Sequence, residues 1–116
     1  MGNPFVHVEL HTTDLKTVKQ FYSALFDWKL HDIPGFGYTM VNVGEGTAGG
    51  MCVDSDHSPA WRPYVQVEDI HAATKKAESL GAKIIKEVTE VPMTGWFSVI
   101  ADPTGALLGL WQPKGR

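Results

Sequence analysis

The feature that most constrains the fold is an internal repeat. The pair Asp14-Leu15 follows an alternating polar and apolar stretch and opens an amphipathic segment, and Asp69-Ile70 does the same 55 positions later. The apolar positions of the two segments largely coincide under this offset, with Leu25 falling on Leu80. Self-similarity at this length predicts two copies of one supersecondary unit. Two such halves facing each other would enclose a groove, where small ligands commonly bind.

Each copy has the pattern of a strand, a helix and three further strands. Alternating polar and apolar side chains are typical of half-buried strands, and Asp14 and Asp69 are of the residue type that begins helices. Gly81 is expected to end the second helix. The first copy predicts strands at 5–11, 28–33, 37–43 and 47–53 with a helix after Asp14, and the second predicts strands at 62–67, 84–91, 95–101 and 106–112 with a helix at 69–80.

The predicted fold class is α+β. Two tandem βαβββ modules are expected to form a curved mixed sheet with a concave groove. Module 1 covers 5–53 and module 2 covers 62–112, and both lie in a single domain, 1–116, because this length is usual for one domain. The polar, proline-containing stretch 54–60 between them is typical of a linker.

Composition excludes several classes of function. The net charge is only −3, and the sequence has no basic run longer than Lys75-Lys76, so nucleic acid is not expected as a partner. The N-terminus shows neither a signal peptide nor a membrane span, which favours a cytoplasmic protein and no membrane partner. Cys52 is the single cysteine, so an internal disulfide is excluded. Its apolar neighbours predict a core position for Cys52.

Several short motifs, in their order and spacing, resemble the glyoxalase/bleomycin-resistance/dioxygenase family, also called the vicinal oxygen chelate superfamily. The resemblance covers nearly the whole chain and rests on the sequences at 9–15, 21–22, 25–28, 64–70 and 102–106. It implies paired βαβββ modules and often a homodimer. In enzymes of the family, a divalent metal is held by one group from the first and one from the last strand of each module. In the drug-binding branch, aromatic groove walls hold the ligand without metal.

Only one of the four metal-ligand positions that the resemblance implies is kept. His7 matches the first ligand, where related enzymes have His or Gln. The second position falls on Gly50 or Met51, the third on Arg62 and the fourth on Gly109. A catalytic metal needs about three protein ligands, so we expect no cofactor and no metal at these positions.

An irregular metal site stays open as an alternative, because His7, Glu9 and His11 project to one face of a predicted strand. The ends of this row are about 13 Å apart, so one ion could bridge neighbours but not the whole row. The other interpretation is a groove wall of hydrogen-bonded polar side chains. For catalysis, Glu9 beside His7 or His11 is the candidate general base, and His7 is the second candidate catalytic residue. Arg62 could hold a carboxylate or a phosphate.

The alternation of the strands predicts which side chains line the groove. Aromatic side chains with a few polar groups are typical of a small-molecule site, although such aromatics also fill interfaces between subunits. The same parity places Trp96 and Ser98 on the groove side. The candidate ligand-binding residues are His7, Glu9, His11, Tyr38, Met40, Arg62, Tyr64, Gln66, Trp96 and Trp111.

The function expected from the sequence is binding of a small organic molecule in an aromatic-lined groove, without the usual divalent metal and as a homodimer. The alternative is a lyase, isomerase or dioxygenase of the same superfamily. Such an enzyme would use a rearranged metal site or a metal-free Glu and His pair.

Overall fold

The computed structural model describes residues 2–35 and 37–115, and the chain divides into two compact units. The first module is Val6–Arg62, and the second module joins the N-terminal residues through Phe5 to the chain from Pro63 onward. The elements are β1 (Phe5–Thr12), α1 (Leu15–Leu25), β2 (Lys29–Ile33), β3 (Tyr38–Asn42), β4 (Gly49–Val53), β5 (Ala60–Gln66), α2 (Ile70–Ser79), β6 (Lys83–Val91), β7 (Gly95–Ala101) and β8 (Leu107–Pro113). The predicted order of two βαβββ modules is confirmed.

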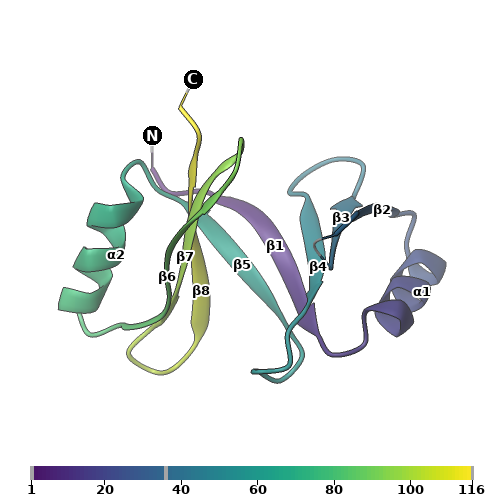
Figure 1. The fold of residues 1–116 in the computed structure, drawn as a ribbon, viewed down its shortest axis with the longest axis horizontal. Coiled ribbons are helices and arrows are strands. Elements are labelled where there is room, and N and C mark those ends of the chain that lie inside the picture. The colour runs from purple at the N-terminus through teal and green to yellow at the C-terminus, as the bar shows by residue number, and fades with distance from the viewer. Residues whose placement is uncertain (1, 36, 116) are drawn as a thin grey trace. The chain divides into compact units, whose positions relative to one another are not determined.

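The first module is a four-stranded sheet with α1 on one face (Figure 1). Its strand order is β2-β3-β4-β1, in which β1 runs parallel to β4 and the other neighbours are antiparallel. Leu10, Val41 and Met51 form the buried core of this module, and side chains of α1 such as Val18 pack against them. The side chains at alternate positions therefore lie on the face turned away from α1.

The second module repeats this arrangement with strand order β5-β8-β7-β6 and β5 parallel to β8. Its core is Ile70, Ile100 and Leu110, covered by α2. The N-terminal residues also belong here, because Gln66 donates its backbone N–H to the carbonyl of Pro4. The sequence pattern did not predict this N-terminal contribution.

The ends of both helices follow from their sequences. Asp14 accepts a hydrogen bond from the backbone N–H of Thr17, and Asp69 accepts one from that of Ala72, so both predicted N-caps are confirmed. Gly81, with φ of 106°, directly follows the C-cap Leu80 of α2. Among the described residues, neither helix has the length and hydropathy needed to cross a bilayer.

The predicted facing of β7 is wrong by one residue. Ser98 hydrogen-bonds to Thr74 of α2 at 2.8 Å, and Trp96 packs against the core that α2 covers. Trp96 and Ser98 thus face the helix, whereas the sequence pattern placed them on the opposite face. Phe97 lies on that opposite face instead, where its ring contacts Tyr64 with centroids 6.4 Å apart.

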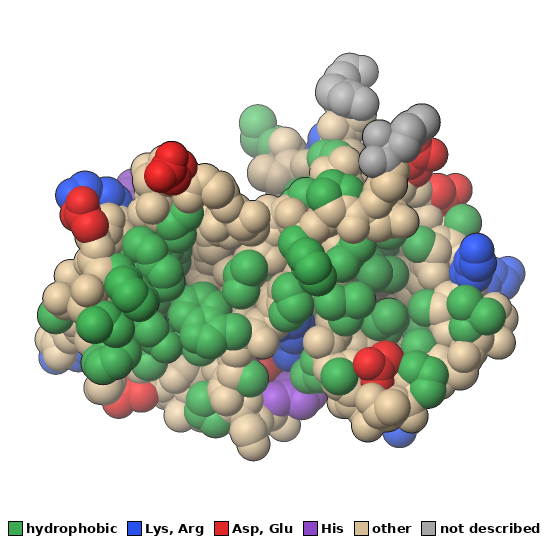
Figure 2. All heavy atoms as spheres, turned by 180° about the vertical axis from the view of Figure 1, so that it is seen from behind, with side chains coloured by type: hydrophobic (Ala, Val, Ile, Leu, Met, Phe, Trp, Pro, Cys, Tyr) green, Lys and Arg blue, Asp and Glu red, His purple; other side chains and the backbone are tan. Residues whose placement is uncertain are grey.

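Apolar side chains also gather on the surface around α1, and Figure 2 shows hydrophobic groups over this part of the molecule. Tyr22 lies at the centre of this cluster, with ring contacts to Trp28 at 5.6 Å and to Trp61 at 5.5 Å. Phe21 and Phe26 extend it and are 56% and 45% exposed. These aromatic residues pack beside the helix, on the face opposite the polar row of β1.

Candidate functional site

The polar row of β1 lies on the face of the first module turned away from α1. Within the described residues of this module, His7, Glu9 and His11 meet Tyr38 of β3 and Cys52 of β4 through side-chain contacts. The register explains the meeting, because His11 pairs with Cys52 across the β1–β4 ladder. Five chemically active side chains are therefore held by regular strands rather than by loops.

His7 contacts the hydroxyl group of Tyr38 and, more distantly, the carboxylate of Glu9, with its Nε2 atom 3.8 Å from Glu9 Oε2. Its Nε2 atom lies 2.8 Å from the Tyr38 hydroxyl. The Tyr38 ring lies over Gly50, so closely that a Cβ atom added there would be 1.9 Å from the hydroxyl oxygen. The second position of the family's metal site is therefore filled by a tyrosine ring, which only a glycine at position 50 allows.

Glu9 is a buried carboxylate bound to His11. Its Oε1 atom lies 2.7 Å from His11 Nε2, and its side chain is 13% exposed. Burial raises the pKa of the Glu9 carboxyl, but interactions with His11, His7 and Tyr38 outweigh burial and hold this pKa well below its ordinary value. Glu9 is thus a stably charged group and a weak base, which is unfavourable for the general-base role considered from the sequence.

Asp54, just after β4, completes the cluster and was not among the residues predicted from the sequence. Its Oδ2 atom lies 3.1 Å from His11 Nδ1 and 3.9 Å from an Arg62 nitrogen. His57 also reaches it, at 3.2 Å. Burial raises the pKa of Asp54, and this effect is outweighed by hydrogen bonds from Asp56 and His57. Asp54 lies two residues after Cys52 and therefore on the same face of the strand. This spacing could have identified Asp54 from the sequence.

Cys52 lies on this polar face rather than in the predicted core. Its Sγ atom is 3.5 Å from His11 Nδ1. Burial, together with the nearby charges of Glu9 and Asp54, raises the pKa of its thiol to about 12. The free thiol is therefore protonated at neutral pH and is a poor nucleophile.

In the second module, Tyr64, Gln66 and Trp111 lie on the face turned away from α2, as predicted. Tyr64 pairs with Gly109 and Gln66 pairs with Trp111 between β5 and β8. The Tyr64 ring covers Gly109, where an added Cβ atom would be 2.2 Å from a ring carbon. The fourth metal-ligand position is thus also filled by a tyrosine ring.

The residues at the family's four metal positions do not fit a metal. Tyrosine rings cover Gly50 and Gly109, and Met51, the alternative second position, is fully buried in the core that α1 covers. The third position is the buried cation Arg62. The Nε atom of Arg62 is buried and has no hydrogen-bond partner among the described residues. A guanidinium carries a permanent positive charge, so it would repel a divalent ion at this position.

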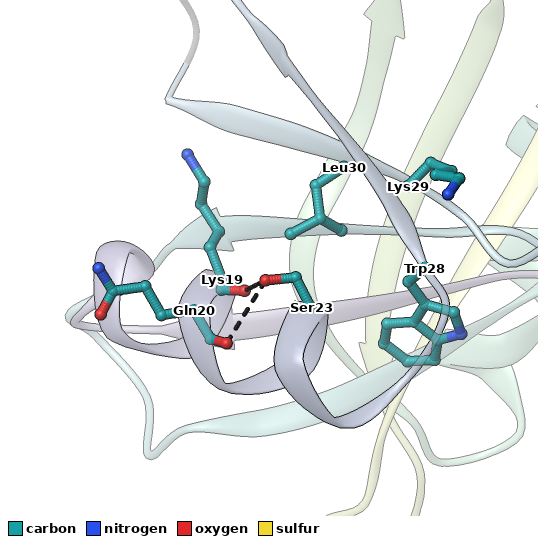
Figure 3. Close-up of a pocket in the computed structure, with 6 residues that line it drawn as sticks. All are labelled: Lys19, Gln20, Ser23, Trp28, Lys29 and Leu30. Atoms are coloured by element: carbon teal, nitrogen blue, oxygen red, sulfur yellow. Dashed lines mark hydrogen bonds between the residues drawn. The ribbon is translucent and has the colours of Figure 1, made fainter.

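A separate shallow hollow of about 460 Å³ lies beside α1 (Figure 3). It is lined by Lys19, Gln20, Ser23, Trp28, Lys29 and Leu30. Lys19 is already bound to Asp32, with its Nζ atom 2.8 Å from a carboxylate oxygen. None of the side chains predicted to bind ligand lines this hollow.

Comparison with known proteins identifies the family. A sequence model of the glyoxalase/bleomycin resistance protein/dioxygenase superfamily matches residues 5–110. The chain belongs to this superfamily. A solved structure of a hypothetical protein from Bacillus halodurans shares the fold, with a TM-score of 0.71 and 18% identity over 100% of this chain and 98% of that one.

Two curated proteins are related to this chain at the sequence level. "Putative glyoxylase CFP32" of Mycobacterium bovis is 35% identical over 114 residues, covering 90% of this chain and 44% of the relative. "Anthracycline biosynthesis protein DnrV" of Streptomyces peucetius is 28% identical over 123 residues, covering 90% of this chain and 45% of the relative. This superfamily member therefore spans less than half the length of these curated relatives.

The charge of Glu9 predicts acid-dependent stability. In the folded chain, the pKa of the Glu9 carboxyl lies below its ordinary value of 4.5. As the pH falls below about 4.5, the unfolded chain therefore takes up a proton at Glu9 more readily than the folded chain does. The stabilisation is present above pH 4.5 and is lost as the pH falls further. Glu9→Gln is expected to lower the free energy of unfolding by about 2 kcal/mol at pH 7, and by clearly less at pH 3.

Urea unfolding at both pH values measures this difference. Glu45→Gln, in an exposed turn, is the control and should change the free energy of unfolding little at either pH. If Glu9→Gln lowered the free energy of unfolding equally at pH 7 and pH 3, the lowered pKa of Glu9 would be contradicted.

Proposed function

We propose that this superfamily member binds a small organic molecule with an aromatic ring system, and that binding does not require the family's divalent metal. The first module provides the face described above, with Tyr38, Met40 and His7 as its ligand contacts. The second module presents Tyr64, Gln66 and Trp111 on its corresponding face. The main observation behind this proposal is that tyrosine rings lie over Gly50 and Gly109, the positions where related enzymes hold metal ligands.

Exposure on the first face supports this assignment. Met40 is 40% exposed although it lies in the middle of β3, and the His7 side chain is 26% exposed. Methionine is flexible and polarisable, so it adapts to aromatic ligands of different shapes. On the same face, the Glu9–His11–Asp54 contacts join β1 to the end of β4.

The sequence relationship to an anthracycline biosynthesis protein suggests a probe. Anthracyclines have a planar fused ring system that can stack on a tyrosine. Titration with an anthracycline, followed by quenching of tryptophan fluorescence in excess EDTA, is expected to give saturable binding. Replacing Tyr38 with leucine should weaken binding roughly 5- to 12-fold, because an aromatic pair contributes about 1–1.5 kcal/mol.

The matched control is His71→Ala, an exposed position on α2 that should leave the affinity unchanged. Cyclohexanediol, which has no aromatic ring, should not bind. Equal affinity for the wild type and Tyr38→Leu, or binding that disappears in EDTA, would overturn the proposal.

A further inference from the structure

Three donor side chains of different chemistry meet in the first module. Glu9 and His11 come from β1 and Cys52 comes from β4, and one ligand atom from each lies within 4.8 Å of the other two. The Glu9 Oε1 to His11 Nε2 distance is 2.7 Å, and the Cys52 Sγ to His11 Nε2 distance is 4.0 Å. A carboxylate, an imidazole and a thiol from two paired strands are thus neighbours on one face of the sheet.

These spacings are close to those that a tetrahedral ion requires. Zinc bonds of about 2.0 Å to oxygen and nitrogen and about 2.3 Å to sulfur place the ligand atoms about 3.3–3.6 Å apart. Glu9 and His11 would separate slightly, and Cys52 Sγ, which lies 3.5 Å from His11 Nδ1, would move toward the Nε2 side of the ring. Small side-chain rotations can supply such movements, because all three residues lie on regular strands whose backbone need not change.

A second carboxylate orients the imidazole of His11. Asp54 Oδ2 lies 3.1 Å from His11 Nδ1, on the opposite side of the ring from Glu9. Histidine ligands in proteins usually donate their other ring N–H to such a carboxylate, which fixes the tautomer and directs the free nitrogen to the metal. Asp54 is itself held by the backbone N–H of Asp56 and by Arg62.

We propose that Glu9, His11 and Cys52 bind one zinc-type transition-metal ion, with Asp54 as the positioning residue for His11. The Cys52 thiol loses its proton to solvent as the ion binds, and the ion accepts lone pairs from the Cys52 thiolate, His11 Nε2 and the Glu9 carboxylate. A thiolate with an imidazole favours zinc or cobalt over magnesium or calcium. Three protein ligands leave a fourth coordination position for water or another small ligand.

This site is distinct from the family's metal positions. Of those four positions, only His7 carries a ligating side chain, and His7 is not one of the three ligands. The inference goes beyond the proposed function, which concerns an organic molecule and needs no ion. The two can therefore fail separately, because one is tested with a metal salt alone and the other in EDTA.

Cobalt(II) titration of the chelator-treated full chain tests the site. Tetrahedral cobalt gives visible bands, and a cobalt–thiolate bond adds a charge-transfer band in the near ultraviolet. We expect both sets of bands to saturate at one equivalent, and zinc to displace the cobalt. Cys52→Ser should remove the charge-transfer band, and His11→Ala should weaken cobalt binding at least tenfold.

Matched variants distinguish ion binding by these three side chains from ion binding elsewhere on the chain. Asp54→Asn should keep one equivalent but weaken binding about 10- to 100-fold, as expected for a residue that orients a ligand. His7→Ala and His31→Ala should retain both the band and the affinity, with folding of every variant checked by circular dichroism. The absence of a thiolate band in the folded wild type, or loss of binding in His7→Ala but not in His11→Ala, would overturn the proposal.

Discussion

Replacing Gly49 with alanine is expected to lower the free energy of unfolding by about 3 kcal/mol. A Cβ atom at this position would lie 2.4 Å from the carbonyl oxygen of Val8. Val8 is the residue that pairs with Gly49 in the parallel β1–β4 ladder, so the obstacle is backbone that cannot rotate away. The two strands would have to separate, which would weaken the ladder that also holds His11 beside Cys52.

Urea unfolding followed by circular dichroism measures this loss. Gly115→Ala is the control, because a Cβ atom there meets nothing within 4 Å, and its effect should stay within about 0.5 kcal/mol. Gly95→Ala is the matching change in the second module, where the Cβ atom would be 2.3 Å from the carbonyl oxygen of Gln112. A Gly49→Ala variant as stable as the wild type would contradict the close approach of β1 and β4.

Much of the fold could be predicted because local signals agree with the repeat. Asp14 and Asp69 begin the helices, and Gly81 directly follows the C-cap of the second one. These residues act through hydrogen bonds to their own neighbours in sequence, so the helix ends can be predicted without knowledge of distant contacts. The facing of β1 was equally readable, since its polar and apolar residues alternate strictly.

The facing of β7 could not be predicted in this way, because both faces of that strand carry apolar side chains. An offset of 58 across the repeat pairs Tyr38 with Trp96, and it leads to the facing of β7 expected from the sequence, which is wrong. An offset of 59, which relates Gly50 to Gly109, pairs Tyr38 with Phe97 and Val41 with Ile100, in agreement with the two cores. A difference of one residue in the repeat reverses every face of a strand.

The candidate site was predicted in part. The row His7, Glu9 and His11 was found from alternation alone. Its partners depend on strand register, which brings Cys52 to His11 and Tyr38 over Gly50. Asp54 was taken as part of a linker because its neighbours are polar, although it continues the facing of β4.

Gly50→Ala tests the role of the tyrosine ring in ligand binding. A Cβ atom at Gly50 would lie 1.9 Å from the Tyr38 hydroxyl oxygen and 2.3 Å from the ring carbon that bears it. Because these atoms are at the end of a rotatable side chain, the ring can swing away while the strand stays in place. We therefore expect a smaller loss of stability than for Gly49→Ala, together with loss of the His7–Tyr38 contact.

The most direct measurement of the central claim is the affinity of an anthracycline for Gly50→Ala and for the wild type, both in excess EDTA. The predicted result is saturable binding to the wild type that weakens roughly 5- to 12-fold in Gly50→Ala, as in Tyr38→Leu, a loss of about 1–1.5 kcal/mol. Gly115→Ala should bind as the wild type does. Unchanged affinity in a folded Gly50→Ala variant, or wild-type binding that appears only after a divalent metal is added, would contradict metal-independent binding on the Tyr38 face.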